Sequence, residues 1–201
     1  MVNTEFYTKS QLDKLGNALI FLCKHLDPTT PVSKTHLLKL VFILEESSIK
    51  KYGIPFFNLK FNVWKLGPVS KDLYVELTDE PNLLADYISR TEMKNGNFSI
   101  CPNKEFSDDE FNDNEIALLN EVADRFKYCT AKELINFTHR KNTPWYNTAQ
   151  RHGLVDALEE GRINATDIEI DMSELIQDDE QKLALYRSHQ EFLEQSRSLK
   201  N

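Results

Sequence analysis

The sequence predicts an α+β fold that is predominantly helical and contains a small antiparallel β-sheet. Apolar residues recur at helical spacing through most of the chain, which is typical of helices packed on a core. Alternation of apolar and polar residues over 56–66 and an Asn-Gly pair within 87–101 predict a strand and a hairpin. We therefore expect the strand and the hairpin to form a sheet on which the helices pack.

The first helix is expected from about residue 9 to Leu26. Thr8 and Gln11 have the spacing of a capping box, in which each side chain bonds the backbone N–H of the other residue. Leucines then follow at helical spacing, namely Leu12, Leu15, Leu19 and Leu22. The helix should end at Asp27, because the residue before Pro28 is disfavoured in the helical region.

A second helix is expected to begin after Ser33, a suitable N-cap, and to end at Gly53. Its residues are apolar around much of the circumference from Leu37 to Leu44, so we expect it in the middle of the core. Lys39 interrupts these residues. We expect its stem to lie along apolar surface with its ammonium in water; the alternative is a buried ion pair that marks a functional groove.

The predicted β-structure follows this helix. The strand over 56–66 has Phe57, Leu59, Phe61 and Val63 on one face, with polar residues between them. The segment Leu66-Gly67-Pro68-Val69 is interpreted as a turn, after which Ser70 can cap a short helix through Leu77. Asn95-Gly96 suits the tight turn of a hairpin over 87–101, because both residues tolerate a positive φ.

The chain from residue 107 onward is predicted to be helical. Ser107 and Asn112 are alternative starts of one helix, since each has a glutamate three residues later. Thr130 begins another helix with the same pattern. Thr143 caps a third, with Pro144 at the first helical position, where its missing N–H costs nothing.

The end of the chain is predicted to be a helical extension over 171–201, joined to a domain over 1–170. Leu183, Tyr186 and Phe192 recur there at roughly helical spacing. An amphipathic helix of this kind can fill a groove on a partner protein. The alternative is that it packs back on this domain or on a second copy of the chain, which would give a homo-oligomer.

Composition indicates a globular protein. The 201 residues are 40% hydrophobic, which suits one domain with a core that needs no disulfide or metal. The first ten residues are polar, unlike a signal peptide, and no apolar run approaches the ~20 residues that span a bilayer. Cys23, Cys101 and Cys129 are odd in number and widely spaced, so we expect reduced thiols and a cytoplasmic location.

The charge is distributed unevenly along the chain. Residues 1–75 contain ten lysines and six acidic residues, a net charge of +4, whereas the remainder carries −12. The basic third either contacts an acidic partner or is a solvated surface. Binding to DNA, as a regulator of its own or a mobile-element operon, is the main alternative function. Nucleic acid is not the expected partner, because residues 1–75 contain no arginine and the Asp27–Pro31 connection lacks the glycine turn of a helix-turn-helix.

Catalytic and metal-binding motifs are not recognisable. The sequence contains no Walker loop, Gly-x-Ser-x-Gly, His-Glu-x-x-His or Cys-x-x-Cys. Cys129 with His139, and His139 with His152, lack the spacing of a nucleophile pair or a metal site. We therefore expect a protein that is not an enzyme, with no catalytic residue, metal or cofactor.

Three blocks of sequence carry a family resemblance. They are Leu37–Phe42 (which includes Lys39) continuing through Lys51–Pro55; Trp64-x-x-Gly67-Pro68-Val69 followed by Leu73-Tyr74; and Leu134-x-x-Phe137-Thr138-His139 followed by Pro144-Trp145. In their order and spacing, over about residues 9–165, they resemble the Panacea (SocA-like) antitoxin family. This family is a former domain of unknown function that also occurs in phage-associated proteins.

The resemblance implies an antitoxin module whose partner is a cognate toxin. Family members neutralise toxins of several unrelated kinds by direct binding, and at least one branch resembles a proteolytic adaptor that delivers its toxin to a bacterial AAA+ protease. No catalytic residue or cofactor comes with the family.

The motif residues themselves have more than one interpretation. Trp64 and Tyr74 either fill the core or expose one ring as an anchor for a partner. His139 is expected to cap helix carbonyls or to hydrogen-bond across to the Trp145 segment, and a partner contact is the alternative.

Overall fold

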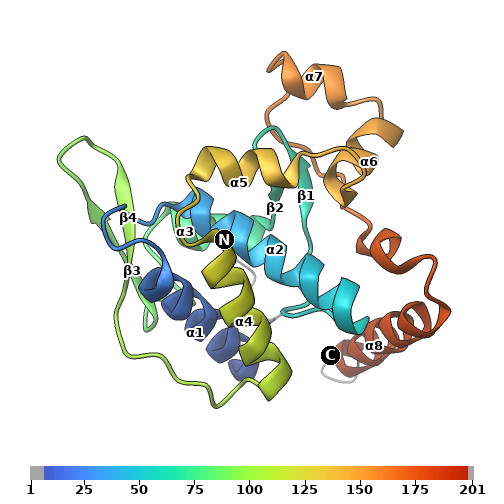
Figure 1. Cartoon of the computed structure of the whole chain (residues 1–201), viewed down its shortest axis with the longest axis horizontal. Helices are drawn as coiled ribbons and strands as arrows, with labels where there is room; N and C mark the ends of the chain where they lie inside the picture. The colour runs from blue at the N-terminus through green and yellow to red at the C-terminus, as the bar shows by residue number, and fades with distance from the viewer. Residues whose placement is uncertain (1–6, 199–201) are drawn as a thin grey trace.

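A long central helix, α2 (Lys34–Tyr52), organises the fold. The computed structural model describes residues 7–198, and Figure 1 shows α2 in the middle of this part of the chain. Ser33 and His36 form a capping box at its start, and Gly53 caps its end. Its buried residues lie on every side of the helix, so the predicted central position is confirmed.

The helices around α2 begin where capping residues predict. The side-chain oxygens of their N-cap residues accept hydrogen bonds from backbone N–H groups that the first helical turn leaves unpaired. These helices and their caps are α1 (Lys9–His25) after Thr8, α4 (Asp113–Phe126) after Asn112, α5 (Ala131–Thr138) after Thr130 and α6 (Pro144–Arg151) after Thr143. Of the two alternative starts for α4, the structure uses Asn112.

The α+β class is confirmed, but the β-structure is divided into two antiparallel sheets. β1 (Asn62–Trp64) pairs with β2 (Gly67–Val69), and β3 (Ile88–Glu92) pairs with β4 (Phe98–Pro102). The second pair is the predicted hairpin. The expected single sheet was wrong because the segment interpreted as a turn is itself strand β2, which follows a tight turn and pairs back on β1.

The predicted strand over 56–66 is strand only at its end. Phe57, Leu59 and Phe61 are buried, as the alternation indicated. However, the backbone N–H groups of Phe57 and Leu59 bond the side chain of Glu45 instead of a neighbouring strand. Segment 56–61 is therefore a loop with an alternating burial pattern.

A segment after α7 (Val155–Glu159) completes the sheet of β1 and β2. The N–H of Val63 donates to the carbonyl of Ile168, and the N–H of Ile170 donates to the carbonyl of Phe61. A bridge between Asn62 and Glu169 lies between these two bonds. β1 is thus held on both edges.

The remaining elements lie at the ends of the core. α3 (Lys71–Thr78) follows β2 directly, and the short 3₁₀ helix η2 (Met172–Ile176) packs against α2 with Met172 and Ile176 buried. α8 (Glu180–Ser198) then lies beside the C-terminal part of α2 (Figure 1). The predicted extension continued to residue 201, and its last three residues lie outside the described range.

Within residues 7–198, no helix combines the length and the apolar character needed to cross a membrane.

Candidate functional site

The three motif blocks meet at one place, around the side chain of Lys39. Lys39 lies on α2 with 1% of its surface exposed, and its Nζ donates to the carbonyl oxygen of Pro68 in β2 at 2.7 Å. Gly67 packs so closely that a Cβ there would lie 3.1 Å from Lys39 Nζ and 2.9 Å from Thr138 Oγ1. We call Lys39, Gly67, Pro68, Thr138, His139, Trp145 and Trp64 the motif junction.

Lys39 differs from both expectations for it. Its ammonium is not exposed to water, and no carboxylate in the described part of the chain pairs with it. Burial lowers the pKa of Lys39 to about 7, because the charged form loses its hydration. The expected exposed position failed because β2 covers this face of α2.

His139 ends α5 and contacts Trp145 through its ring. The two ring centroids lie 4.0 Å apart, and Nε2 of His139 is buried with no hydrogen-bond partner among the described residues. Burial, and then the charge of Lys39, lower the pKa of His139 to about 4, so its imidazole is neutral near pH 7. His139 therefore contacts Trp145 through its ring, and the expected hydrogen bond to the Trp145 segment is not formed in the described part of the chain.

The two tryptophans tie the β1–β2 hairpin to the later segments. Nε1 of Trp145 donates to the carbonyl of Trp64 at 3.0 Å, and Nε1 of Trp64 donates to the carbonyl of Thr166 at 3.2 Å. The ring of Trp64 meets that of Tyr74 edge-on at 4.9 Å. Trp145 is buried, whereas Trp64 and Tyr74 are half-buried, so each of these two keeps part of its side chain at the surface.

The other motif residues support this arrangement. Val69 is buried in β2 opposite Asn62, which keeps Pro68 facing α2. Pro144 is buried at the start of α6, where it directs Trp145 toward the hairpin. The motif therefore specifies how α2, β2, α5 and α6 fit together.

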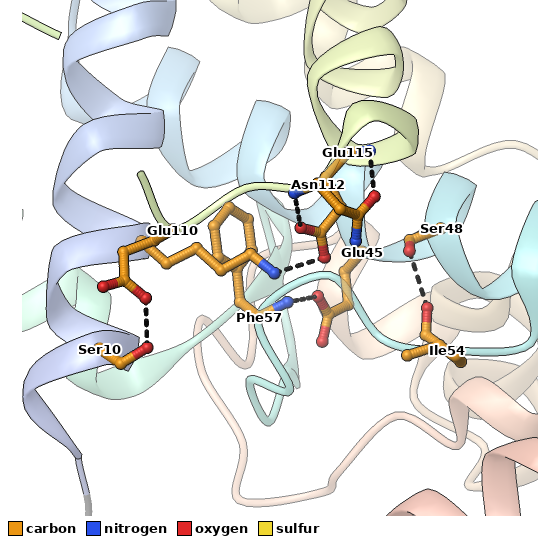
Figure 2. A network of polar contacts seen from close by, with 9 residues as sticks. Ser10, Glu45, Ser48, Ile54, Phe57, Glu110, Asn112 and Glu115 are labelled. Carbon is orange, nitrogen blue, oxygen red and sulfur yellow. Dashed lines mark hydrogen bonds and ion pairs between the residues drawn. The ribbon is translucent and has the colours of Figure 1, made fainter. Parts of the chain in front are cut away.

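Glu45 is a further buried charge on α2 that was not predicted from the sequence. Glu45 is 1% exposed, and its carboxylate accepts the N–H of Phe57 at 2.7 Å and that of Leu59 at 3.0 Å (Figure 2 shows the first bond). Burial raises the pKa of Glu45 to about 7, although these N–H donors favour its charged form. An acidic residue within the apolar run of α2 was the available signal.

The candidate residues of the terminal helix lie apart from the motif junction. Leu183 and Tyr186 are half-buried on the face of α8 that packs on the core, so the helix packs back on its own domain along this face. Phe192 is 65% exposed and Leu185 is 44% exposed. Nε2 of Gln190 donates to Asn58 Oδ1 in the 56–61 loop at 2.7 Å.

The described part of the chain offers no group of three or more histidine, cysteine or acidic side chains placed to hold a metal ion. Cys23, Cys101 and Cys129 are free thiols. The polar groups of the motif junction are instead directed at backbone carbonyls and aromatic rings.

The fold and the motif junction define a predominantly helical α+β domain organised around α2. The family model of the antitoxin SocA-like, Panacea domain matches residues 37–146, which is more than half of the chain. The chain belongs to this family. The match extends from α2 to α6 and includes the whole motif junction. Searches of the curated proteins and of the solved structures each found no match.

Proposed function

We propose that this protein neutralises a cognate toxin by binding it directly, as a stoichiometric antitoxin, and that it does not catalyse a reaction. Membership of the antitoxin family is the observation that carries the proposal. The use of Lys39 and Glu45 supports it, since their charged side chains bind the protein's own backbone, in β2 and in the 56–61 loop respectively. Binding then depends on the surfaces that this framework presents.

The surface lysines favour a protein partner over nucleic acid. At least six of the ten lysines in residues 1–75 form ion pairs with acidic side chains. These are Lys14 with Glu115, Lys24 with Glu105, Lys50 with Glu46, Lys51 with Glu121, Lys60 with Glu169 and Lys71 with Asp167. Phosphate binding depends on cations that are free to displace counterions, and each of these lysines already has an acidic side chain beside it that competes with a phosphate.

The outward face of α8 is the toxin contact that we propose. Leu185 and Phe192 are exposed there, on the side away from half-buried Leu183 and Tyr186. Large apolar residues that are exposed on a helix are suited to fill a groove on another protein.

Co-expression with the product of the adjacent gene tests the function. If the neighbouring protein arrests growth alone, and this chain restores growth and copurifies with it, the antitoxin function is supported. A neighbour that is harmless and does not copurify contradicts the proposal for this pair.

Two variants test the proposed contact. A chain that ends at Asp178 lacks α8 but keeps η2, whose Met172 and Ile176 belong to the core. Phe192→Ser removes one exposed ring and should weaken toxin binding about tenfold or more, as for an interface anchor. Gln195→Ser is the matched control on an exposed position of the same helix. Unchanged affinity of the shortened chain would place the contact elsewhere.

The fate of the toxin separates two mechanisms. If the antitoxin covers the toxin, the half-life of the toxin in cells should stay the same or lengthen when the two are co-expressed. If it is an adaptor for an AAA+ protease, the half-life should shorten, and the effect should disappear in cells that lack the protease.

A further inference from the structure

A groove with both polar and apolar lining residues lies beside β1, outside the motif junction. It has a volume of about 550 Å³ and lies between the start of α1, the start of α3 and the sheet around β1. Pockets of ~300–1,000 Å³ are typical of sites that enclose a ligand. We call it the carboxamide groove because three of its lining residues are Gln11, Asn58 and Asn62.

Two buried polar side chains of the groove have no partner. Asn62 is 8% exposed and Ser70 is 2% exposed, and the structure gives neither side chain a hydrogen bond among the residues it describes. Ser70 occupies the N-cap of α3 without capping it. The carboxamide of Asn62 and the hydroxyl of Ser70 are not among the fully buried polar atoms that lack a partner, so they reach the solvent of the groove and are available to bond a ligand there.

The free hydrogen-bonding groups of the groove include both donors and acceptors. Oε1 of Gln11 accepts the N–H of Thr8, and Oδ1 of Asn58 is bound by Gln190, so their NH₂ groups remain as donors. Asn62 keeps both its oxygen and its NH₂ group, and Ser70 keeps its hydroxyl. A peptide group, with one N–H and one C=O, is complementary to such a set.

The charges around the groove disfavour a strongly charged ligand. Lys60 pairs with Glu169, Lys71 pairs with Asp167, and Asp72 accepts the hydroxyl of Tyr7. With both signs present and the lysines neutralised, neither a polyanion nor a cation is attracted selectively.

The strand beside the groove is fixed in position. β1 is hydrogen-bonded on one edge to β2 and on the other to the segment of Ile168 and Ile170. The side chain of Asn62 is therefore presented from a rigid strand, as a site with defined geometry requires.

We propose that the carboxamide groove binds an extended segment of a partner polypeptide by hydrogen bonds to its main-chain amides, with Asn62 and Ser70 as the central contacts. The inference does not depend on the identity of the toxin, because it concerns main-chain recognition in the groove and not the exposed residues of α8, although Gln190 of α8 bonds the lining residue Asn58. A partner that binds at both places would gain affinity from the linkage.

Selection of a phage-displayed library of random peptides on the full-length protein tests this inference. Enriched peptides are synthesised, and their affinities are measured by fluorescence anisotropy. Asn62→Leu combined with Ser70→Ala should weaken binding about tenfold or more, since two or more hydrogen bonds are lost. Ser70→Ala alone should weaken it by a smaller factor without affecting folding, because the hydroxyl makes no cap bond.

The control is Asn120→Leu on the exposed face of α4, where the carboxamide bonds only the carbonyl of Ile116 in its own helix. Its peptide affinity should equal that of the wild type. Backbone amide NMR shifts of the wild-type protein on peptide addition give a readout without any substitution, and they should change at Asn62, Ser70 and Glu169. The inference is overturned if no peptide is enriched, if the double variant binds as tightly as the wild type, or if the shifts lie elsewhere. If the protein binds glycans on a bacterial oligosaccharide array but binds no peptide, the inference is also overturned, and the groove is assigned to carbohydrate.

Discussion

Lys39 and Glu45, the two most deeply buried charged residues of α2, each hold a neighbouring segment, but their hydrogen-bonding groups are not equally satisfied. Lys39, toward the start of the helix, holds the β1–β2 hairpin by donating to the carbonyl of Pro68. Glu45, nearly two turns further on, holds the 56–61 loop by accepting the N–H groups of Phe57 and Leu59. Each is 1% exposed, so neither is hydrated.

The difference lies in how completely each charge is satisfied. The carboxylate of Glu45 has several backbone donors around it, whereas the Lys39 ammonium has one acceptor among the described residues, the carbonyl of Pro68. A buried charge with few partners costs stability, and one with many partners stabilises the loop that supplies them. We therefore expect Glu45 to be required for folding, and Lys39 to be tolerated at a cost.

Glu45→Leu should have the largest effect on stability. It leaves the buried N–H groups of Phe57 and Leu59 without an acceptor, and we expect the free energy of unfolding to fall by about 3–5 kcal/mol. Urea denaturation measures the change. Glu45→Gln, which keeps one acceptor oxygen, should lose about 1 kcal/mol. If Glu45→Leu lowers the free energy of unfolding by less than about 1 kcal/mol, the role assigned to Glu45 is contradicted.

Gly67→Ala should have the next largest effect, because it disturbs the Lys39 end of α2. Gly67 has a φ of +95°, and an added Cβ would lie 2.9 Å from Thr138 Oγ1. Backbone strain and this contact together should lower the free energy of unfolding by about 2–4 kcal/mol. Gly96→Ala is the matched control: its φ is +77°, but nothing lies within 4 Å of the added atom. Equal losses for the two variants would show that packing against Lys39 and Thr138 contributes nothing.

More of the functional residues could be predicted from the sequence at the Lys39 end of α2 than at the Glu45 end. Lys39, Gly67 and Trp145 were identified through the resemblance of their sequence blocks to the Panacea family, which can be recognised without coordinates. Their mutual contacts could not be predicted, since they depend on how β2 and α6 pack against α2.

The 56–61 loop shows why the predicted strand over 56–66 was only partly correct. The alternation of apolar and polar residues predicts which side chains are buried, and the burial of Phe57 and Leu59 was predicted correctly. It does not report where the backbone N–H groups bond, and here they bond a distant side chain. The carboxamide groove could not be predicted from the sequence either, because its residues Gln11, Asn62 and Ser70 come from separate elements.

Lys39→Met tests the cost of the buried lysine through its pH dependence. The pKa of Lys39 is about 7 in the folded protein and 10.5 ordinarily, so between these values the unfolded chain binds more protons. Wild-type stability should therefore rise with pH across this window and decline as pH falls toward 7. Methionine does not titrate, so any stability advantage of Lys39→Met should shrink by about 1–3 kcal/mol from about pH 7 to about pH 9.

Urea denaturation of both proteins across this range measures the difference. Glu45 titrates in both proteins, so its contribution largely cancels, and His139, whose pKa is lowered to about 4 mainly by burial, is neutral across this range. A difference that does not change with pH would mean that Lys39 remains charged in the folded protein throughout the range.

Gln190→Ala should have the smallest effect on stability. This variant tests whether α8 supports the Glu45 end of α2. Nε2 of Gln190 bonds Asn58 Oδ1 in the loop that Glu45 holds, so its loss should lower the free energy of unfolding by about 0.5–1.5 kcal/mol. Gln181→Ala, at an exposed position of the same helix, should change it by less than about 0.5 kcal/mol. Hydrogen exchange gives a more local measurement: the amides of Phe57 and Leu59 should lose protection in Gln190→Ala, while strands β3 and β4 keep theirs. If the loop amides exchange as slowly as in the wild type, Glu45 alone holds the loop, and α8 is free to bind a partner without any effect on the core.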